Sequence, residues 1–299
     1  MAEETIHRED WKFPFFSIWI GQAFSLLGSR IAQFALIWWL TKMTGSATVL
    51  ATASMVGILP EILLGPFAGA YVDRLNRRWV MIIADGAVAL ASLWLAVMFW
   101  TGAAQVWHIY VIMAVRALGG AFHWPAMQSS TSLMVPRKHL TRVAGMNQTL
   151  YGSLNIAGPP LGALLMELLP LEGVMLVDVG TALLAIAPLF FVAIPQPQRD
   201  AGEGTSSILM DMWEGLRYAW DWLGLRYLII VAMVFKLVLT PAFSLVPLLV
   251  SQHFGGDAAQ LSLFQAMSGI GAVIGGLALS AWGGFQKKIF TTMAWMVGF

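Results

Sequence analysis

The sequence predicts an all-α membrane protein, because it is too apolar and too poor in charge for a soluble protein. Hydrophobic residues make up 58% of the 299 residues and charged residues only 11%, against about 45–50% and about 25% in soluble domains. The apolar residues are gathered into long segments, and a bilayer core requires about 20 such residues per helix. The lack of cysteine excludes disulfides, thiolate metal sites and cysteine nucleophiles.

Eight segments are long and apolar enough to cross the membrane. In chain order we expect spans near Phe13–Thr41, Ala47–Tyr71, Trp79–Trp100, Val106–Met127, Leu140–Leu169, Gly173–Ile194, Arg226–Val250 and Ala258–Trp282. A ninth apolar segment, Ile289 to Phe299, would reach only about 16 Å, roughly half of the bilayer core. We therefore expect the chain to be a fragment of a longer protein.

The positions of lysine and arginine predict a cytoplasmic N-terminus. Most of the 17 basic residues fall in connections on one side of the membrane, from Arg8 and Lys12 to Lys287 and Lys288, whereas only Lys42 lies in a connection on the other side. Basic residues concentrate in cytoplasmic loops. The sequence thus predicts a multi-pass protein of the cell membrane, plasma or inner.

One long polar connection divides the chain. Residues 1–194 would form a six-helix half, 195–225 a cytoplasmic linker, and 226–299 an incomplete second half with two spans and part of a third. Apolar residues recur at helical spacing in the linker: Leu209, Met212, Trp213, Leu216, Trp220 and Leu223. This spacing predicts an amphipathic helix that lies in the membrane interface or packs against the cytoplasmic loops.

Charged residues inside the spans are candidates for function, because a central Arg or Asp costs about 2.5–3.5 kcal/mol in a membrane. Glu61 lies deep in the second span after Pro60, a position suited to proton exchange; the alternative is a salt bridge to Arg30 or Arg116. Asp178 is a second candidate for proton exchange, or else a solvated carboxylate at a helix start.

Asp85 is close to the cytoplasmic end of its span, so we expect it to pair with an arginine of a loop. Polar residues also follow single faces of several spans, and these stripes with the charges predict a water-filled cavity lined by spans one, two, four, five, seven and eight. The predicted lining residues are Gln22, Ser29, Arg30, Gln33, His123, Asn147, Tyr151, Asn155, Lys236, Thr240 and Gln265. Each stripe alone is also compatible with hydrogen bonds between helices, and His123 with a hydrogen-bonded histidine at a helix end.

Three pairs of glycines spaced four apart, Gly65/Gly69, Gly158/Gly162 and Gly271/Gly275, predict close packing between helices. Enzymatic motifs are missing: the sequence has no Walker loop, no Gly-x-Ser-x-Gly and no His-Glu-x-x-His. We therefore expect no enzyme, no cofactor, no metal site and no nucleic-acid partner.

Three motifs resemble those of the major facilitator superfamily. Residues 69–78, Gly-Ala-Tyr-Val-Asp-Arg-Leu-Asn-Arg-Arg, are similar to its cytoplasmic signature Gly-x-Leu-Ala-Asp-Arg-x-Gly-Arg-Lys. The run Arg116–Gly120 resembles the family's buried-arginine motif. Residues 158–163 resemble its fifth-helix antiporter motif, with Leu154 and Ala163 in place of glycines. The runs 25–29, 44–47 and 122–126 are similar to the macrolide-efflux-like branch of the drug:proton antiporters.

The resemblance implies a major-facilitator-type bundle of twelve helices, of which about eight and a half are present, working by alternating access. It implies a conformational lock at Gly69, Asp73, Arg74, Arg77 and Arg78. It also implies that Arg116 is coupled to protonation, and that Gly158, Pro159 and Gly162 shape the fifth helix against the other half.

The function so implied is secondary active transport: proton-coupled efflux of a small amphipathic, drug- or macrolide-like compound by a protein that is monomeric at full length. Its partners would be that compound, protons and the bilayer. The alternatives are a non-pumping sensor or scaffold of the same fold, or an exporter of a siderophore or a lysolipid.

Overall fold

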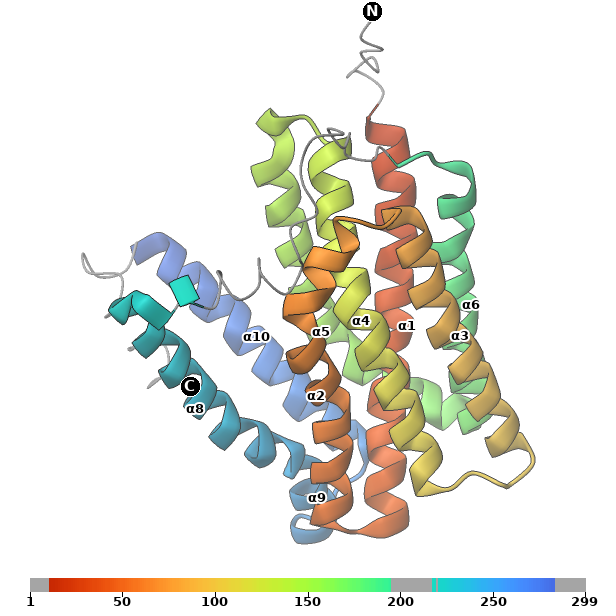
Figure 1. Cartoon of the computed structure of the whole chain (residues 1–299). Helices are drawn as coiled ribbons and strands as arrows, with labels where there is room; N and C mark the ends of the chain where they lie inside the picture. The colour runs from red at the N-terminus through yellow and green to blue at the C-terminus, as the bar shows by residue number, and fades with distance from the viewer. Residues whose placement is uncertain (1–10, 195–216, 219, 283–299) are drawn as a thin grey trace, which may run out of the picture.

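The computed structural model describes residues 11–194, 217–218 and 220–282, and the described residues form an all-helical fold (Figure 1). The first half consists of α1 (Lys12–Thr44), α2 (Ala47–Val72), α3 (Arg77–Trp100), α4 (Val106–Met134), α5 (Leu140–Leu168) and α6 (Leu171–Phe191). The short η1 (Arg137–His139) lies between α4 and α5. The long helices after the first half are α8 (Leu223–Ser244) and α10 (Ala258–Trp282), and the short α9 (Val246–Leu248) and η2 (Leu249–His253) lie between them. The predicted all-α class is confirmed.

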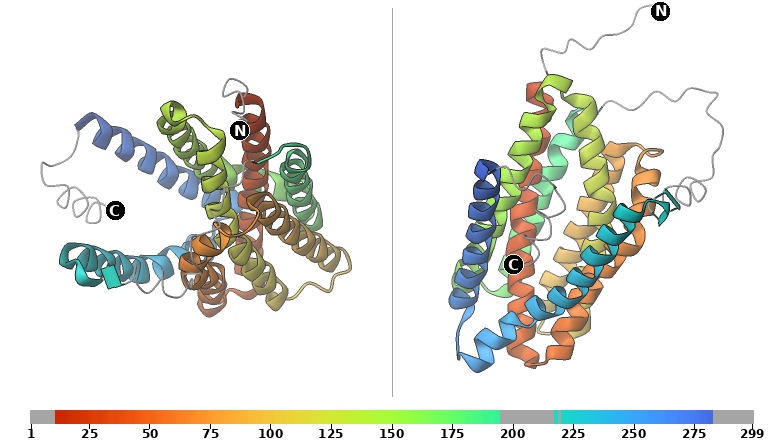
Figure 2. Two further views of the ribbon diagram at one scale, coloured as in Figure 1. Left: turned by 45° about the horizontal axis from the view of Figure 1, so that its top comes forward. Right: turned by 90° about the vertical axis from the view of Figure 1, so that its left-hand side faces the viewer.

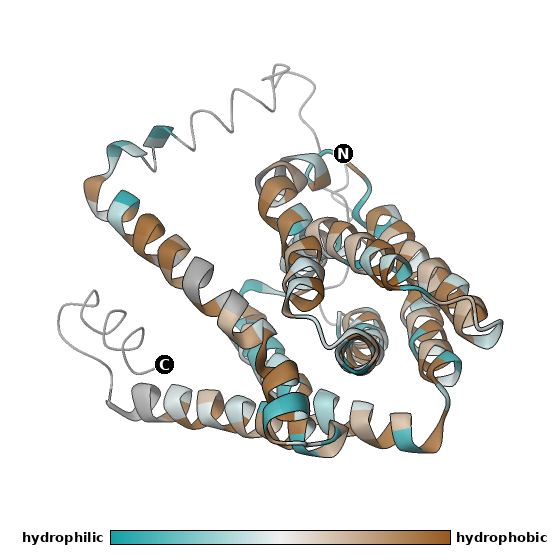
Figure 3. Ribbon diagram, turned by 90° about the horizontal axis from the view of Figure 1, so that it is seen from below, coloured by the Kyte–Doolittle hydropathy of each residue, from teal (hydrophilic) through white to brown (hydrophobic). Residues whose placement is uncertain are grey.

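Six described helices, α1, α2, α3, α4, α6 and α10, are long and apolar enough to cross a membrane by length and composition. Helix α5 is equally long but carries a polar stripe that includes Asn147, Tyr151 and Asn155. Figure 3 shows hydrophobic residues along α8 and around the first-half bundle. Large apolar side chains such as Leu90, Leu183 and Phe191 are exposed, as expected for helices in contact with lipid.

Local sequence explains several helix ends. Gly45 ends α1 in the left-handed conformation, with φ 56°, which an L residue adopts only at a cost. The side chain of Ser46 then accepts a hydrogen bond from the Val49 N–H and caps α2. Asn76 caps α3 in the same way, accepting from the N–H groups of Arg78 and Trp79.

Helix α1 lies at the centre of the first half and contacts α5 and α6 along its length (Figure 2). The larger hydrophobic core, which includes the fully buried Leu36, Leu40, Leu95 and Ile109, fills the end of the bundle opposite the N-terminus. A smaller core around Ile18 closes the N-terminal end, where α1, α2, α3, α4 and α6 all contribute buried side chains.

The seventh predicted span, Arg226–Val250, is not one helix. Helix α8 ends at Ser244, the short α9 contains Pro247, and a π-helical turn, η2, follows. Pro247 lacks the N–H group that would continue the hydrogen bonds of α8, and it stands in the first turn of α9, where proline is tolerated. The prediction of a continuous span was therefore wrong at its end.

Helices α8 and α10 meet the first half at the end opposite the N-terminus and diverge from each other toward the other end (Figure 2). At the meeting point Phe34 and Trp38 of α1 pack with Val250 and Leu261. The side chain of Gln252 donates a hydrogen bond of 3.1 Å to the Gly45 carbonyl.

Two predictions lie wholly or mainly outside the described residues: the amphipathic helix in the linker and the ninth span. The division of the chain at 195–225 likewise stays a prediction.

Candidate functional site

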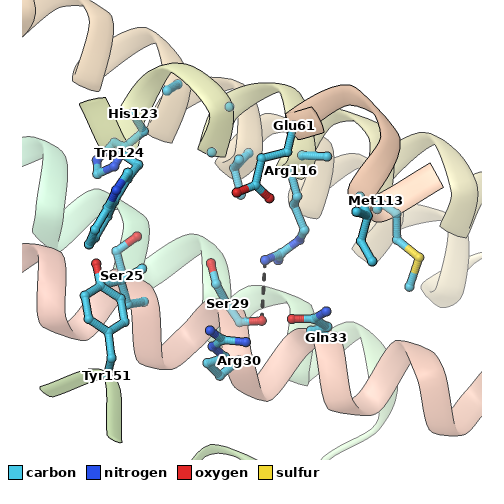
Figure 4. A pocket seen from close by; sticks show the side chains of 18 of the residues that line it. Ser25, Ser29, Arg30, Gln33, Glu61, Met113, Arg116, His123, Trp124 and Tyr151 are labelled. Carbon is cyan, nitrogen blue, oxygen red and sulfur yellow. Dashed lines mark hydrogen bonds between the residues drawn. The ribbon is translucent and has the colours of Figure 1, made fainter. Parts of the chain in front are cut away.

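A cavity of about 840 Å³ lies between the first half and α8 (Figure 4). The structure places seven predicted residues in its lining: Gln22, Ser29, Arg30, Gln33, His123, Asn147 and Tyr151. Glu61 and Arg116 line it as well, and α3 contributes Ala84, Asp85 and Val88. The side chains of Lys236 and Thr240 are not among the described ones.

Asn155 and Gln265 lie outside the lining, contrary to expectation. Helix α10 packs along α5 instead of facing the cavity, and a Cβ on Gly269 would lie 2.9 Å from the Ile156 side chain. Of the predicted lining spans, the eighth is therefore replaced by the third.

Arg116 and Asp178 form an ion pair in the interior of the first half. The Ser92 hydroxyl donates to the Oδ2 atom of Asp178 at 2.6 Å, and the Ser29 hydroxyl donates to Oδ1 at 3.2 Å. Arg116 also donates to the Ser29 carbonyl at 3.5 Å, the contact dashed in Figure 4. The four side chains come from α1, α3, α4 and α6, so this network joins four helices.

The alternative of a solvated helix-start carboxylate is wrong for Asp178. Its side chain is only 1% exposed, and it lies two turns inside α6, which begins at Leu171. The salt bridge considered for Glu61 is also not formed: among the described residues Glu61 has no ion-pair partner. Arg116 is held by Asp178, and Arg30 lies near Tyr151. Glu61 is exposed to the cavity instead.

Asp85 is paired inside the bundle and not with a loop arginine, so this expectation was wrong. Gln22 donates to Asp85 Oδ2 at 2.8 Å, and His123 Nε2 lies 3.5 Å from the same oxygen. The nearby arginines are engaged elsewhere: Arg77 pairs with Asp73 at 3.1 Å, and Arg78 donates to the Phe190 carbonyl.

Aromatic residues form part of the cavity wall, and reasoning from polar stripes found Tyr151 but missed Trp19 and Trp124. Trp124 packs edge-on against Tyr151, with ring centroids 5.1 Å apart. Trp19 donates its indole N–H to Asn147 at 2.7 Å. Helical spacing carried the signal, because Trp19 lies three residues before Gln22 on the same face.

The predicted lock residues follow one another around the α2–α3 connection. The side chain of Arg77 is largely buried and reaches back to the exposed Asp73, and Arg78 ties the start of α3 to the end of α6. Arg74 is exposed, and a Cβ on Gly69 would meet no described atom within 4 Å. The described contacts of this segment thus bind it to the first half.

Gly158 and Gly162 pack against α1 of the same half. A Cβ on Gly158 would lie 2.9 Å from Arg30 Cβ, and one on Gly162 would lie 2.9 Å from the Phe34 ring. The resemblance implied that these glycines and Pro159 face the other half. For Gly158 and Gly162 this expectation was wrong, because both face α1. The other two glycine pairs, Gly65/Gly69 and Gly271/Gly275, have no described neighbour within 4 Å of such a Cβ.

The chain is similar to known membrane transporters in sequence and in fold. The sequence model of the Major Facilitator Superfamily matches residues 18–299. Macrolide efflux protein A of Streptococcus pyogenes is 35% identical over 97% of this chain and 72% of its own length. Macrolide efflux protein A of Enterococcus faecalis is 32% identical over 85% of this chain and 79% of its own length.

The fold is also similar to the crystal structure of a bacterial homologue of the human lysosomal transporter Spinster in an inward-facing, unoccupied conformation. The TM-score is 0.67 at 13% sequence identity, covering 92% of this chain and 64% of that one.

Proposed function

The chain belongs to the Major Facilitator Superfamily and its macrolide-efflux-like branch, and from this premise we propose that it exports a macrolide-like amphipathic compound in exchange for protons. The cavity supports the substrate class. Its volume of about 840 Å³ lies within the range of about 300–1,000 Å³ for drug-sized ligands. Trp19, Trp124 and Tyr151 offer apolar surface with polar tips, which suits an amphipathic compound.

The observation that carries the proposal is the buried Arg116–Asp178 pair. Ionisable groups at membrane depth are costly, and such groups mark ion or substrate pathways. A proton on Asp178 cancels the attraction to Arg116 and weakens the acceptor for the Ser29 and Ser92 hydroxyls. Since the four residues come from four helices, protonation changes the packing between them. Protonation of Asp178 is in this way coupled to a rearrangement of the four helices.

Glu61 is the second proton carrier in this proposal. Its carboxylate reaches the cavity from α2 without a counter-ion among the described residues. The Glu61 carboxylate can bind a proton or pair with a basic group of the substrate, but not both at once. Proton and substrate therefore compete for Glu61. Such competition is what an antiporter requires.

Alternating access is part of the proposal, and the packing at one end of the bundle supports it. With the N-terminus cytoplasmic, the contact of Phe34 and Trp38 with Val250 and Leu261 closes the outer end. The predicted lock residues Asp73 and Arg77 lie at the opposite end, where their ion pair stays within the first half. In this proposal the full-length protein acts as a monomer in the cell membrane.

The test uses the protein reconstituted in liposomes with a pH-sensitive dye inside and a macrolide antibiotic added outside. We expect macrolide-driven proton flux that Asp178→Asn abolishes and Glu167→Gln, the same exchange at an exposed carboxylate, leaves unchanged. Macrolide binding without any proton flux in the unmodified protein would overturn the proposal in favour of a sensor or scaffold.

A further inference from the structure

Two polar layers repeat on the same faces of three helices. The Asp178 layer consists of Ser29, Ser92 and Arg116 around Asp178. The Asp85 layer consists of Gln22, Asp85 and His123. The two layers are seven residues apart on every shared helix: Gln22 and Ser29 on α1, Asp85 and Ser92 on α3, His123 and Arg116 on α4. Seven residues rise about 10 Å in a helix.

Each layer joins one acid to one basic side chain of α4. In the Asp178 layer the acid comes from α6. Seven residues further along α6 is the buried Ala185, and in the Asp85 layer the acid comes from α3 instead. Figure 4 shows His123 and Arg116 on one side of α4, both facing the cavity. The two layers thus place an acid beside a basic side chain of α4 at two depths in the membrane.

The Asp85 layer lies between the N-terminal end of the bundle and Asp178. Asp85 is two turns from the start of α3, and its side chain and that of His123 are 11% and 15% exposed and line the cavity. Asp178 does not line the cavity. A proton that enters from the N-terminal end through the cavity therefore meets Asp85 and His123 before it reaches Asp178.

The contact between Asp85 and His123 is incomplete. The His123 Nε2 atom is buried, yet at 3.5 Å from Asp85 it makes no hydrogen bond. A buried polar atom without a hydrogen bond is unfavourable, because it has lost its contact with water and gained no partner. A second proton on the imidazole adds an attraction that closes this gap, which gives the pair two arrangements that differ by one proton.

We propose that Asp85 and His123 form a second proton-exchange site, through which Asp178 exchanges protons with the solution at the N-terminal end. The inference rests on the proton-coupled export proposed above. A proton from cavity water binds the free ring nitrogen of His123 and gives an imidazolium beside Asp85. The imidazolium then returns the proton to cavity water beside Ser29, which lines the cavity. The Ser29 hydroxyl accepts that proton as it passes its own to the Oδ1 atom of Asp178, to which it is hydrogen-bonded. His123 is neutral again, Arg116 keeps its charge, and one proton has moved.

Other charged groups also face this cavity. Within the described chain these are Arg30 on α1, Glu61 on α2 and Arg116 on α4; α5 contributes the neutral Asn147 and Tyr151, and α6 the apolar Ala185 at this depth. Each charged group stays in place when Asp85 or His123 is replaced, so a change in titration reports on the pair itself.

The first experiment needs no substrate. Infrared difference spectra of the purified protein, recorded along a pH titration, follow the protonation of carboxyl groups. We expect separate carboxyl bands that are lost in Asp85→Asn and in Asp178→Asn and kept in Glu167→Gln. His123→Gln should move the midpoint of the Asp85 band by about one pH unit or more and leave the Asp178 band in place.

The second experiment measures macrolide-driven proton flux in liposomes at saturating macrolide, where Asp85→Asn and His123→Gln should each reduce the flux about tenfold. Spectra of Asp85→Asn identical to those of the unmodified protein would overturn the second site. Failure of the proposed function has a different signature: full proton flux in Asp178→Asn, whatever the Asp85 band does.

Discussion

Replacement of Arg116 by alanine should destabilise the protein far more than replacement of Asp178 by asparagine. Arg116→Ala leaves a carboxylate that is 1% exposed without its cation, and the loss of one partner of a buried pair costs about 3–5 kcal/mol. The Ser29 and Ser92 hydroxyls still donate to Asp178, so we expect the lower part of that range. Asp178→Asn leaves a guanidinium that borders the cavity and can bind water, and should cost about 1–2 kcal/mol.

The assay is thermal unfolding of the purified protein in detergent at pH 7. At about 2–4 °C per kcal/mol, Arg116→Ala should lower the Tm by about 6–12 °C and Asp178→Asn by no more than about half as much. The double variant Arg116→Ala with Asp178→Asn removes both charges, so its loss should be smaller than the sum of the two single losses by about 2 kcal/mol. Additive losses would refute the pair as an energetic unit.

Three further predictions follow from single contacts. Glu61→Gln should abolish macrolide-driven proton flux with normal membrane insertion, because the amide cannot change charge; unchanged pH dependence of export would exclude Glu61 from coupling. Gly158→Ala should lower the Tm, since its Cβ would lie 2.9 Å from a neighbouring side-chain atom on α1, whereas Gly180→Ala, which meets nothing within 4 Å, should not. Gln252→Ala removes the hydrogen bond to Gly45, so a cysteine placed at the closed end should be labelled faster. The chain has no natural cysteine, so the label reports on that position alone, and an unchanged labelling rate would contradict this prediction.

The membrane-spanning helices could be predicted from the sequence because apolar length is a local property. Helix α2 covers Ala47–Val72, against a prediction of Ala47–Tyr71. Helix α4 runs to Met134, beyond the predicted end at Met127. The extra turns are polar, and the hydroxyls of Ser130 and Thr131 donate to carbonyls of the preceding turn. Such residues stay helical without being apolar, so hydropathy alone ends the helix too early.

The cavity could be predicted in part, because polar stripes indicate which face of a helix avoids lipid. They do not indicate which face meets which neighbour. Asn155 continues the stripe of Asn147 and Tyr151 on α5, yet it lies outside the cavity lining, beside the contact with α10. The break after Ser244 likewise depends on packing as well as on Pro247, since α9 and η2 rest on α1.

Depth in the membrane alone could not identify the partner of Arg116. The predicted span began at Gly173, so Asp178 would be five residues, or about 7.5 Å, inside. Helix α6 begins at Leu171, after Pro170, which puts Asp178 about 10 Å from that end. Arg116 is ten residues, or about 15 Å, inside α4, which begins on the same side. An arginine side chain spans the remaining 5 Å. Glu61, fourteen residues into α2, is about 21 Å deep, so depth counted from correct helix ends favours neither acid strongly. The rotation of each helix decides between them, and only the packing of α1, α3, α4 and α6 against one another fixes it.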